Sequence, residues 1–600
     1  MATFYASKTG EVSAREKEHS ALVRELAGEC MTLLENDGTL PLAGAGKVAV
    51  YGNGVRHTVK GGTGSGDVNT RTVVTIEQGL KEAGFEILTG KWLDEYDKVL
   101  ADAQAAYQAE LAKKAEELHV PIFAVMFSEV FAQPDVPVIT EKEDTDTAIY
   151  VLSRNSGEGA DRYNRACDYL LGENELADIA YLAEHYEKTV LILNIANLVD
   201  TTELKKIKGL NAILLAGQAG NATGNIVADV VLGKSIPSGK LTDTWAASYE
   251  DYPSSKNFSH NNGDTNDEYY SDGIYVGYRY FETFAPEKVM YEFGFGLSYT
   301  EFSMETVKAE STGNGKDAKI ALSIRVKNTG AAAGKEAAQV YVSAPQGQLG
   351  KPAKVLCGFA KTKLLAPGEE EVLELTIPVS RFASYDDSGV TGHKSCYVLE
   401  EGLYKIYVGN SVRCTEKANV DGKGGYEVSS CIVTEELEEA LAPTKEFLRL
   451  KTGRQKEDGV FARAYEKAPQ QMVDLAERIK SRLPKELPQT GNKGITLQAV
   501  AENIKNGSSV EEELDAFVAQ FTNEELAVIV RGEGMSSPKV TPGTASAFGG
   551  VSDSLHGYGI PIACASDGPS GIRMESGLKA TQLPLSLIHI SEPTRPEPIS

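Results

Sequence analysis

The sequence predicts a multidomain chain of the α/β plus all-β class, with an α/β domain first and a β-sandwich after it. Three observations lead to this prediction. Unbroken apolar runs alternate with helical patterns up to about residue 260, and a period of two replaces them after residue 301. The length of 600 residues also exceeds what a single hydrophobic core usually supports.

Short apolar runs in residues 1–260 predict parallel strands. They read KVAVYGNG, TAIYVLS (147–153), TVLILNI (189–195) and NAILLAG (211–217), and the helical pattern ENELADIAYLAEHY (173–186) lies among them. Runs of Val, Ile and Leu without polar alternation are typical of strands that are covered on both faces. We therefore expect residues 1–260 to form one α/β domain.

Two more helices are expected in this domain. Ser13 and Glu16 have the spacing of a capping box, and leucines follow at roughly helical intervals as far as Asn36. Residues 92–118 are polar and rich in Ala, Glu and Lys, which predicts a solvent-exposed helix.

Residues 261–300 are predicted to be a connecting segment, polar at first and then dense in tyrosine. The stretch GIYVGYRYF (273–281) has two interpretations, core packing or a wall on which an apolar ligand face stacks, and packing is favoured. Residues 301–435 then alternate with a period of two in KIALSIRVKNTG, VLELTIP and GLYKIYVG, with turn signals between them. Half-buried strands joined by turns predict a β-sandwich.

The chain becomes charged again after the sandwich. Residues 436–500 are predicted to be a helical linker, and SSVEEELDAFVAQFTNEELAVIV holds two further helical patterns. The stretch GIPIACASDGPSGIR (559–573) predicts a short strand that ends at Ser566 and Asp567.

Composition excludes several classes of partner. The net charge of −25 argues against nucleic acid and anionic membranes, because phosphate binding needs clustered Lys and Arg. The seven cysteines show no CxxC pair and no metal-ligand spacing with the eight histidines, so we expect free thiols in a reducing compartment. Neither a signal peptide nor a membrane-spanning run is visible, and the expected location is cytoplasmic.

Two carboxylates follow predicted strands. Glu158, in SGEGADR (156–162), lies between two glycines after the run TAIYVL. Ligands of open α/β sheets bind at the carboxyl ends of strands, where a carboxylate on a loop suits general acid/base catalysis. On spacing alone, a solvated loop glutamate paired with Arg162 is the commoner explanation. Asp567 has the same placement, and there a turn-forming aspartate is the commoner explanation.

The glycine-rich stretch KGGTGSGDVN (60–69) is a weak candidate for a phosphate cradle made of backbone N–H groups. It lacks the Lys-Ser/Thr ending of a P-loop and does not fit GxGxxG with a downstream ribose acid. A nucleotide-binding α/β protein is therefore the last of the alternatives.

Together, these segments resemble glycoside hydrolase family 3. KGGTGSGD, VLSRNSGEGADR, GIYVGYRYFETF and YEFGFGLSYTEF resemble the α/β sandwich domain of its β-glucosidases, and residues 301–415 resemble their fibronectin type III-like domain. GIPIACASDGPSGIR resembles the first strand region of their (β/α)8 barrel. In most of the family the barrel comes first, and a minority of gut and rumen bacterial members resemble the order found here.

The resemblance implies a definite domain plan. The parts are an α/β sandwich domain, a connecting segment, a fibronectin type III-like β-sandwich, a helical linker and the incomplete start of a (β/α)8 barrel, at residues 1–260, 261–300, 301–435, 436–500 and 501–584. Residues 585–595, LSLIHISEPTR, resemble a translated sequencing adapter, so residues 585–600 are expected to be an artefact.

The resemblance also implies a retaining, exo-acting β-glucosidase that releases glucose from cello-oligosaccharides or aryl glucosides with no cofactor. Glu158 matches the family's general acid/base, Asp567 an aspartate that binds the nonreducing-end sugar, and Arg573 the arginine of that motif. In this mechanism a second carboxylate, about 5–5.5 Å away, attacks the anomeric carbon. The expected partner is a small β-glucoside or oligosaccharide, and the sequence leaves formation of a homo-oligomer open.

The nucleophile of that mechanism has no match in the sequence. The family's SDW-like barrel motif, and the KH pair before it, are not found after Arg573. The chain is therefore expected to be inactive by itself. The alternatives are a family 3 β-xylosidase or other β-glycosidase, and a noncatalytic sugar-binding protein.

Overall fold

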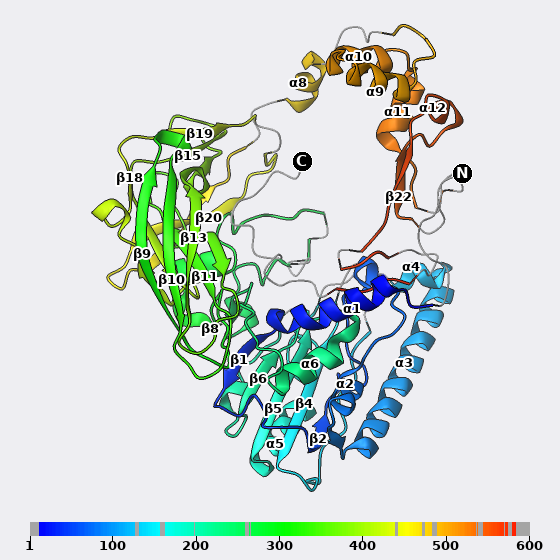
Figure 1. The fold of residues 1–600 in the computed structure, drawn as a ribbon, viewed down its shortest axis with the longest axis vertical. Helices are drawn as coiled ribbons and strands as arrows, with labels where there is room; N and C mark the ends of the chain where they lie inside the picture. Colours follow the sequence, from blue (N-terminus) through cyan, green and yellow to red (C-terminus); the bar gives the residue numbers. More distant parts are fainter. Residues whose placement is uncertain are drawn as a thin grey trace.

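The computed structural model describes residues 11–126, 131–156, 162–196, 198–258, 263–264, 266–438, 442–470, 474–482, 489–535, 537, 544–568, 570–573 and 579–583. Figure 1 shows an α/β domain, a β-sandwich beside it, and a small helical unit whose last strands approach the α/β domain. The adapter-like residues 585–600 lie outside the described part. Within that part, no helix is both long and apolar enough to cross a membrane.

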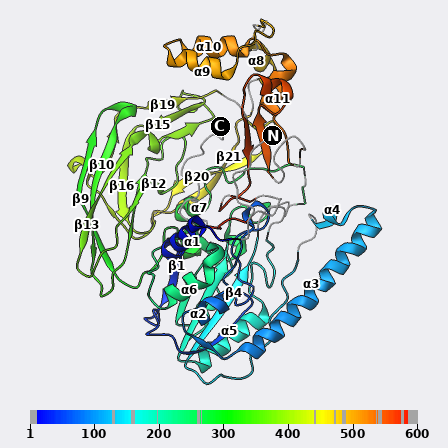
Figure 2. The same cartoon turned by 45° about the vertical axis from the view of Figure 1, so that its right-hand side comes forward.

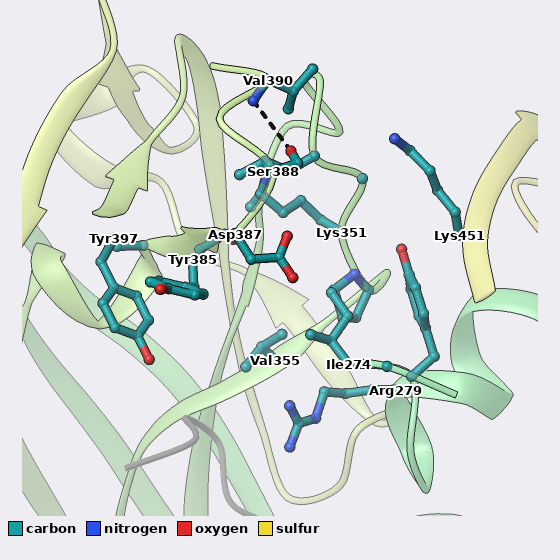
Figure 3. A pocket seen from close by; sticks show the side chains of 18 of the residues that line it. Ile274, Arg279, Lys351, Val355, Tyr385, Asp387, Ser388, Val390, Tyr397 and Lys451 are labelled. Carbon is teal, nitrogen blue, oxygen red and sulfur yellow. Dashed lines mark hydrogen bonds between the residues drawn. The ribbon is translucent and has the colours of Figure 1, made fainter. Parts of the chain in front are cut away.

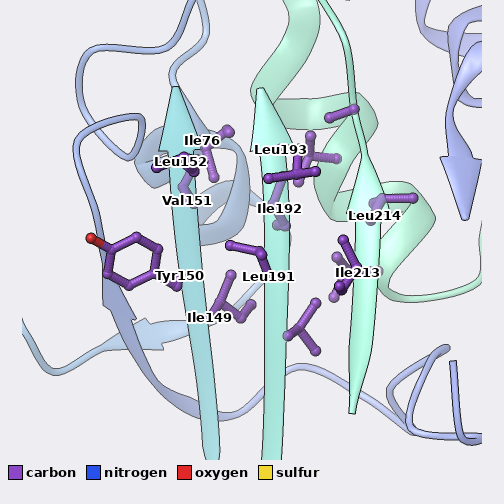
Figure 4. Packing of buried hydrophobic residues seen from close by; sticks show 14 of the residues in the cluster. Ile76, Ile149, Tyr150, Val151, Leu152, Leu191, Ile192, Leu193, Ile213 and Leu214 are labelled. Carbon is purple, nitrogen blue, oxygen red and sulfur yellow. The ribbon is translucent and has the colours of Figure 1, made fainter. Parts of the chain in front are cut away.

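A six-stranded sheet forms the centre of the α/β domain. Its order is β1-β6-β5-β4-β2-β3, with the bounds Thr32–Asn36, Ala212–Leu215, Lys188–Ile195, Thr147–Arg154, Lys47–Tyr51 and Glu86–Ile87. All neighbours pair in parallel except β1, which is antiparallel to β6. The apolar side chains of β4, β5 and β6 are buried (Figure 4), so the predicted parallel strands are confirmed.

Helices complete the core of this domain. Helix α5 packs against β5, while α6 packs against both α1 and α2, and apolar residues of all four helices join the strands in one cluster. Their bounds are Glu173–His185 for α5, Ala14–Ala27 for α1, Ile76–Glu82 for α2 and Thr223–Val231 for α6.

The leucine pattern between Ser13 and Asn36 is divided between a helix and a strand. The capping box is confirmed, because the Ser13 hydroxyl accepts from Glu16 N and the Glu16 carboxylate accepts from Ser13 N. The expected continuation as far as Asn36 is wrong, since α1 ends at Ala27 and a short 3-10 turn leads into β1. Pairing of β1 with the distant β6 explains the difference, because a local pattern does not report a long-range partner.

Helix α3 (Gly90–Leu118) confirms the long helix expected at residues 92–118, but part of it is buried. Trp92 and Tyr96 lie in the core, and the Trp92 ring meets the Tyr51 ring edge-on with centroids 5.4 Å apart. The later turns extend beyond the sheet toward α4 (Ile122–Met126), as Figures 1 and 2 show.

The tyrosine-rich segment is core packing, as favoured. Tyr275, Tyr278, Tyr280 and Phe281 are all buried. The segment contains α7 (Tyr278–Phe284) and leads into β8 (Val289–Tyr291), which pairs with β7 (Trp245–Ala246).

The predicted sandwich is confirmed by two facing sheets. One has the order β13-β10-β9, with the bounds Glu370–Pro378, Lys319–Asn328 and Phe302–Thr312. The other has the order β12-β11-β16-β17, with β18 also on β16, and its bounds are Val355–Lys361, Ala337–Ser343, Gly402–Gly409, Thr415–Lys417 and Tyr426–Val428. A small third sheet contains β14 (Ser384–Asp386), β15 (Cys396–Leu399) and β19 (Ile432–Glu436).

The prediction that residues 436–500 form a helical linker is wrong for its central part. A β-hairpin of β20 (Leu448–Gln455) and β21 (Phe461–Lys467) occupies it, before α8 (Leu475–Arg482). Leu450 and Phe461 pack into the tyrosine-rich cluster, so burial against a distant segment stabilises strands despite the high charge of this sequence.

The last described unit contains the two helical patterns predicted from the sequence. They form α10 (Val510–Val518) and α11 (Asn523–Arg531), capped by the Ser509 and Thr522 hydroxyls, after α9 (Leu497–Lys505). The strand expected before Ser566 is β23 (Ile562–Ala565), which pairs with β22 (Ser546–Gly549) beside α12 (Asp553–Gly557). This pair is antiparallel, whereas barrel strands pair in parallel, so the start of a barrel stays a prediction.

Candidate active site

The carboxyl ends of β2, β4 and β5 lie side by side at one edge of the sheet, and the loops after β2 and β4 carry the glycine-rich stretch 60–69 and Glu158. Glu158, on the loop after β4, lies outside the described residues. Ser156 before it and Arg162 after it are described, so their contacts define where the two ends of this loop are held.

Two buried asparagines tie these strand ends together. The Asn53 amide donates to Ser153 O (3.0 Å), and its oxygen accepts from Ser153 N (2.7 Å). Asn194 accepts from the Ser153 hydroxyl (2.8 Å) and from Val59 N (2.7 Å), and donates to Val59 O (2.9 Å). Because leaving a buried polar group without its partner costs about 1–3 kcal/mol, this network holds the loop after β2 against β4 and β5.

A buried ion pair supports the loop after β4. The Arg154 guanidinium donates to the Glu175 carboxylate (2.6 Å), which also accepts from Gly172 N (2.7 Å). Burial opposes the charge on Arg154, but Glu175 outweighs this effect and raises the pKa of the guanidinium. Arg154 Nε also donates to Asp168 O (3.0 Å), so the pair anchors the far end of the loop.

Arg162 has an acidic partner other than Glu158. Its Nε donates to Asp168 Oδ1 (2.8 Å), and Nη1 donates to Leu198 O (2.7 Å). Burial lowers the pKa of Arg162, and Asp168 opposes that shift. The described contacts thus pair Arg162 with Asp168, whereas the pairing of Arg162 with Glu158 considered from the sequence lies outside the described residues.

The glycine-rich stretch 60–69 contacts the end of the described chain through Lys60. The Lys60 ammonium is paired with the Asp67 carboxylate and donates to Val68 O (2.9 Å) and to Gln582 Oε1 (2.9 Å). A P-loop lysine must be free to reach phosphate oxygens. The pairing with Asp67 therefore disfavours the phosphate cradle considered from the sequence.

Gln582 is fully buried and is bonded on both sides of its amide. Its Nε2 donates to Gly66 O (2.9 Å) and to the Ser570 hydroxyl (3.3 Å). A Cβ atom at Gly61 would lie 1.9 Å from Gln582 Nε2 and 2.8 Å from the backbone oxygen of Gly66, so a larger residue at position 61 would displace Gln582 or the backbone.

Asp567 and Arg573 lie opposite each other in a short antiparallel bridge, where Arg573 N donates to Asp567 O (2.7 Å). Arg573 Nε donates to Asp67 O (3.1 Å), which joins this motif to the glycine-rich stretch. The Asp567 residue is half-buried, and its carboxylate accepts no hydrogen bond from the other described residues. A carboxylate without such donors has the capacity to accept hydrogen bonds from hydroxyl groups.

The glycine-rich stretch also contacts the loop that carries Glu158. Thr63 N donates to Ser156 O (3.2 Å), two residues before Glu158. Segments around residues 63, 156 and 567, far apart in the sequence, therefore meet at one edge of the sheet. An arrangement that brings two carboxylate-bearing segments to one place suits acid/base chemistry on a bound ligand.

Among the described residues, no group of three or more His, Cys, Asp or Glu side chains is arranged to hold a metal ion. All seven cysteines are described and free, as the sequence predicts.

Sequence reasoning missed the residues that join the site together. Asn53 and Asn194 each follow an apolar run, in KVAVYGN and TVLILN. A polar amide at the end of a buried strand could therefore have identified them as residues that bond to a neighbouring segment. No comparable signal marks Lys60 or Gln582, because their bonds cross more than 500 residues of sequence.

Comparisons with known proteins identify two domain families in the chain. Residues 31–299 match the glycosyl hydrolase family 3 C-terminal domain, and residues 336–412 match the fibronectin type III-like domain. A beta-glucosidase of Ruminococcus albus is 40% identical over 574 residues, which are 94% of this chain and 56% of the relative. Beta-glucosidase A of Butyrivibrio fibrisolvens is 35% identical over 638 residues, with 97% and 72% covered.

The chain is also similar to solved structures of beta-glucosidases. A beta-glucosidase from Paenibacillus barengoltzii superposes with a TM-score of 0.84 at 43% identity, over 97% of this chain and 61% of that one. Beta-glucosidase 3B from Thermotoga neapolitana, solved with glucose, superposes with a TM-score of 0.56 at 33% identity, over 70% and 55%. The chain thus spans about three fifths of the length of the relatives from Ruminococcus albus and Paenibacillus barengoltzii.

Proposed function

The chain belongs to glycosyl hydrolase family 3, and we propose that it acts in the retaining hydrolysis of terminal nonreducing β-D-glucosyl residues of cello-oligosaccharides or aryl glucosides. Relatives named beta-glucosidase, and the glucose bound to the Thermotoga neapolitana structure, support this choice of sugar. The observation that carries the proposal is the contact of the glycine-rich stretch with both the Glu158 loop and the Asp567 motif.

We assign three roles within this proposal. Glu158 protonates the leaving oxygen and later activates water as a general base. Asp567 accepts hydrogen bonds from hydroxyls of the nonreducing-end sugar, and Arg573 holds the backbone of that motif against Asp67. Hydrolysis with retention also needs a carboxylate nucleophile about 5–5.5 Å from the acid/base. No segment of this sequence matches the family's nucleophile motif, so we propose that the 600-residue chain by itself turns over slowly.

Glu158→Gln tests the acid/base assignment. In a form of the protein that hydrolyses cellobiose, we expect kcat/KM on cellobiose to fall about 10²–10⁴-fold, because the alcohol leaving group then lacks its proton donor. The fall in kcat/KM should be much smaller on 2,4-dinitrophenyl β-glucoside, whose leaving group needs little protonation, whereas kcat should fall on both substrates because the attacking water loses its general base. Glu184→Gln, on α5, is the matched control and should leave both rates unchanged. Near-normal hydrolysis of cellobiose by Glu158→Gln would remove Glu158 from the mechanism.

A noncatalytic sugar-binding protein is the second candidate, because the sequence holds no match to the nucleophile motif. Calorimetric titration of the chain with glucose, alongside a product assay, separates the two. Saturable binding that Asp567→Asn weakens, without any product, favours this candidate. Comparison of 4-nitrophenyl β-glucoside with the β-xyloside decides between a β-glucosidase and a β-xylosidase.

A further inference from the structure

A cavity of about 800 Å³ lies where the sandwich, the tyrosine-rich segment and the β20–β21 hairpin meet. Figure 3 shows Ile274 and Arg279 from the tyrosine-rich segment near Val355, Tyr385 and Asp387 from the sandwich. None of the described residues in 60–69 or 566–583 lines it, so it is separate from the candidate active site.

The turn on one side of the cavity is held in place by a buried carboxylate. Asp386, at the end of β14, accepts from Gly389 N (2.6 Å) and Thr391 N (2.8 Å), which fixes the turn that follows it. Next to it, Asp387 pairs with Arg449, which also donates from Nε to Glu466 (2.9 Å). The hairpin is thereby joined to the sandwich across the cavity.

The loop on another side is held in a similar way. The buried Glu400 carboxylate pairs with Lys351 and accepts from Gln348 N (2.6 Å). The Lys451 ammonium then donates to Gln348 O (3.2 Å) and to Glu466 (2.8 Å). Because its walls are bonded to one another, the cavity is largely preformed, and binding into it costs little ordering.

Cationic groups outnumber anionic ones around this space, although the chain as a whole carries a net charge of −25. Of the charged described residues that line it, five are basic and two, Asp387 and Glu466, are acidic, the basic ones being Arg279, Lys351, Arg381, Arg449 and Lys451. Arg381 donates to the neutral Cys357 O (3.2 Å) and has no acidic partner among the described residues. Lys351, Arg449 and Lys451 are paired with Glu400, Asp387 and Glu466, so the attraction for an anion rests on Arg381.

The rest of the lining is apolar or aromatic. The rings of Tyr385 and Tyr397 are tilted against each other with centroids 5.2 Å apart, and Ile274, Val355 and Val390 add aliphatic surface. A ligand that buries itself here needs an apolar body as well as a negative charge.

We propose that this cavity binds a small organic acid, a carboxylate carried on an apolar ring or chain, with Arg381 contacting the carboxylate. This goes beyond the proposed glycosidase function, because the site shares no residue with it. The carboxylate accepts charge-assisted hydrogen bonds from the guanidinium, and the body of the ligand packs against the tyrosine rings and the aliphatic side chains.

Calorimetric titration of the 600-residue chain with 3-phenylpropionate tests the proposal, with 3-phenylpropanamide and 3-phenylpropylamine as probes of the same shape. We expect saturable binding of the acid, binding of the amide roughly tenfold weaker because it loses the charge-assisted bonds, and none of the amine. Added glucose should not displace the acid, since the two sites are separate. Equal affinity for the acid and the amide, or no binding of the acid at millimolar concentration, would overturn the proposal.

Substitutions at two exposed positions, Arg381 and Val390, test where the acid binds. Arg381→Gln should weaken binding of the acid roughly tenfold and leave binding of the amide unchanged. Arg325→Gln, at a half-buried arginine of β10, is the control. Val390→Trp, at the rim, should block both probes by filling the entrance. If the acid binds equally well to Arg381→Gln and to Val390→Trp, it binds elsewhere and the assignment of this cavity is wrong.

Discussion

The central sheet and the helical unit at residues 489–573 differ in how much of each is buried. Every residue of β4 and β5 except the first is buried. By contrast, α9 and α10 bury one residue each, Val500 and Phe517, and α11 buries none. Val530 of α11 is 87% exposed. The sheet therefore supplies its own stability, whereas the helical unit depends on two small clusters and on contacts such as those of Gln582.

The largest expected effect is a loss of stability in the α/β domain when its buried ion pair is removed. Arg154→Met leaves Glu175 buried without its partner, and should lower the free energy of unfolding of the α/β domain by about 3–5 kcal/mol. Urea unfolding followed by fluorescence measures this. Arg325→Met, which removes an exposed pair with Glu305, serves as the control and should change stability by less than about 1 kcal/mol. A loss at Arg154 no larger than the control's would show that the pair does not stabilise the fold.

Truncating one buried side chain in each region tests whether the two regions unfold independently. Leu193→Ala, in β5, should destabilise the main unfolding transition by about 2–5 kcal/mol, because it leaves a cavity in a closely packed core. Phe517→Ala should leave that transition unchanged and speed amide exchange only in the helical unit. Differential scanning calorimetry and hydrogen exchange, measured on both variants, check this. The two regions form one cooperative unit if Phe517→Ala also lowers the main transition.

A pH profile tests whether a buried carboxyl group lowers the stability of the closely packed α/β domain. Burial raises the pKa of Asp178, on α5, to about 7, and its Oδ2 has no hydrogen-bond partner among the described residues. Because this pKa is above the unfolded value of about 3.9, the folded state binds more protons between the two values. Stability is therefore full below about pH 4 and falls as pH rises to about 7, by a few kcal/mol in total.

Asp178→Asn should flatten that profile, because the amide stays neutral over the whole range. Unfolding by urea at pH 5 and pH 8 is the measurement, and the variant should gain stability relative to the parent at pH 8. The exposed Asp144→Asn is the control. Identical pH profiles for the parent and Asp178→Asn would contradict the raised pKa.

The smallest effect is expected from the capping boxes, which both regions contain. Ser13 and Thr522 each form a capping box, on α1 and α11, and replacing either by Ala should cost its helix about 1 kcal/mol. Since α1 packs on the sheet domain, Ser13→Ala should lower the main transition, whereas Thr522→Ala should affect only exchange within α11. If both variants shift the main transition equally, the contrast between the regions does not extend to their helix ends.

Local patterns were enough to predict much of the fold. The strands 147–154 and 188–195, the helix α5 and the sandwich strand 319–328 all follow from runs or alternations within about ten residues. They could be predicted because the pattern of burial stays the same along each element: both faces are buried, or only one face is. The capping boxes have the same local origin, because their bonds join residues three positions apart.

Elements whose stability comes from distant partners could not be predicted. The strand β1 depends on β6, and the β20–β21 hairpin depends on Leu450 and Phe461 entering the tyrosine-rich cluster. The sequence alone therefore placed a helix where β1 lies and a helical linker where the hairpin lies.

The candidate site divides in the same way. From the sequence alone, Glu158, Asp567 and Arg573 are candidates for the chemistry, because they stand in recognisable motifs. Which of the segments around them come together is known from the fold. The bonds that join them, from Lys60 to Gln582 and from Thr63 to Ser156, connect backbone and side-chain groups that are far apart in the sequence. Such contacts depend on the packing of the whole chain, which no short pattern contains.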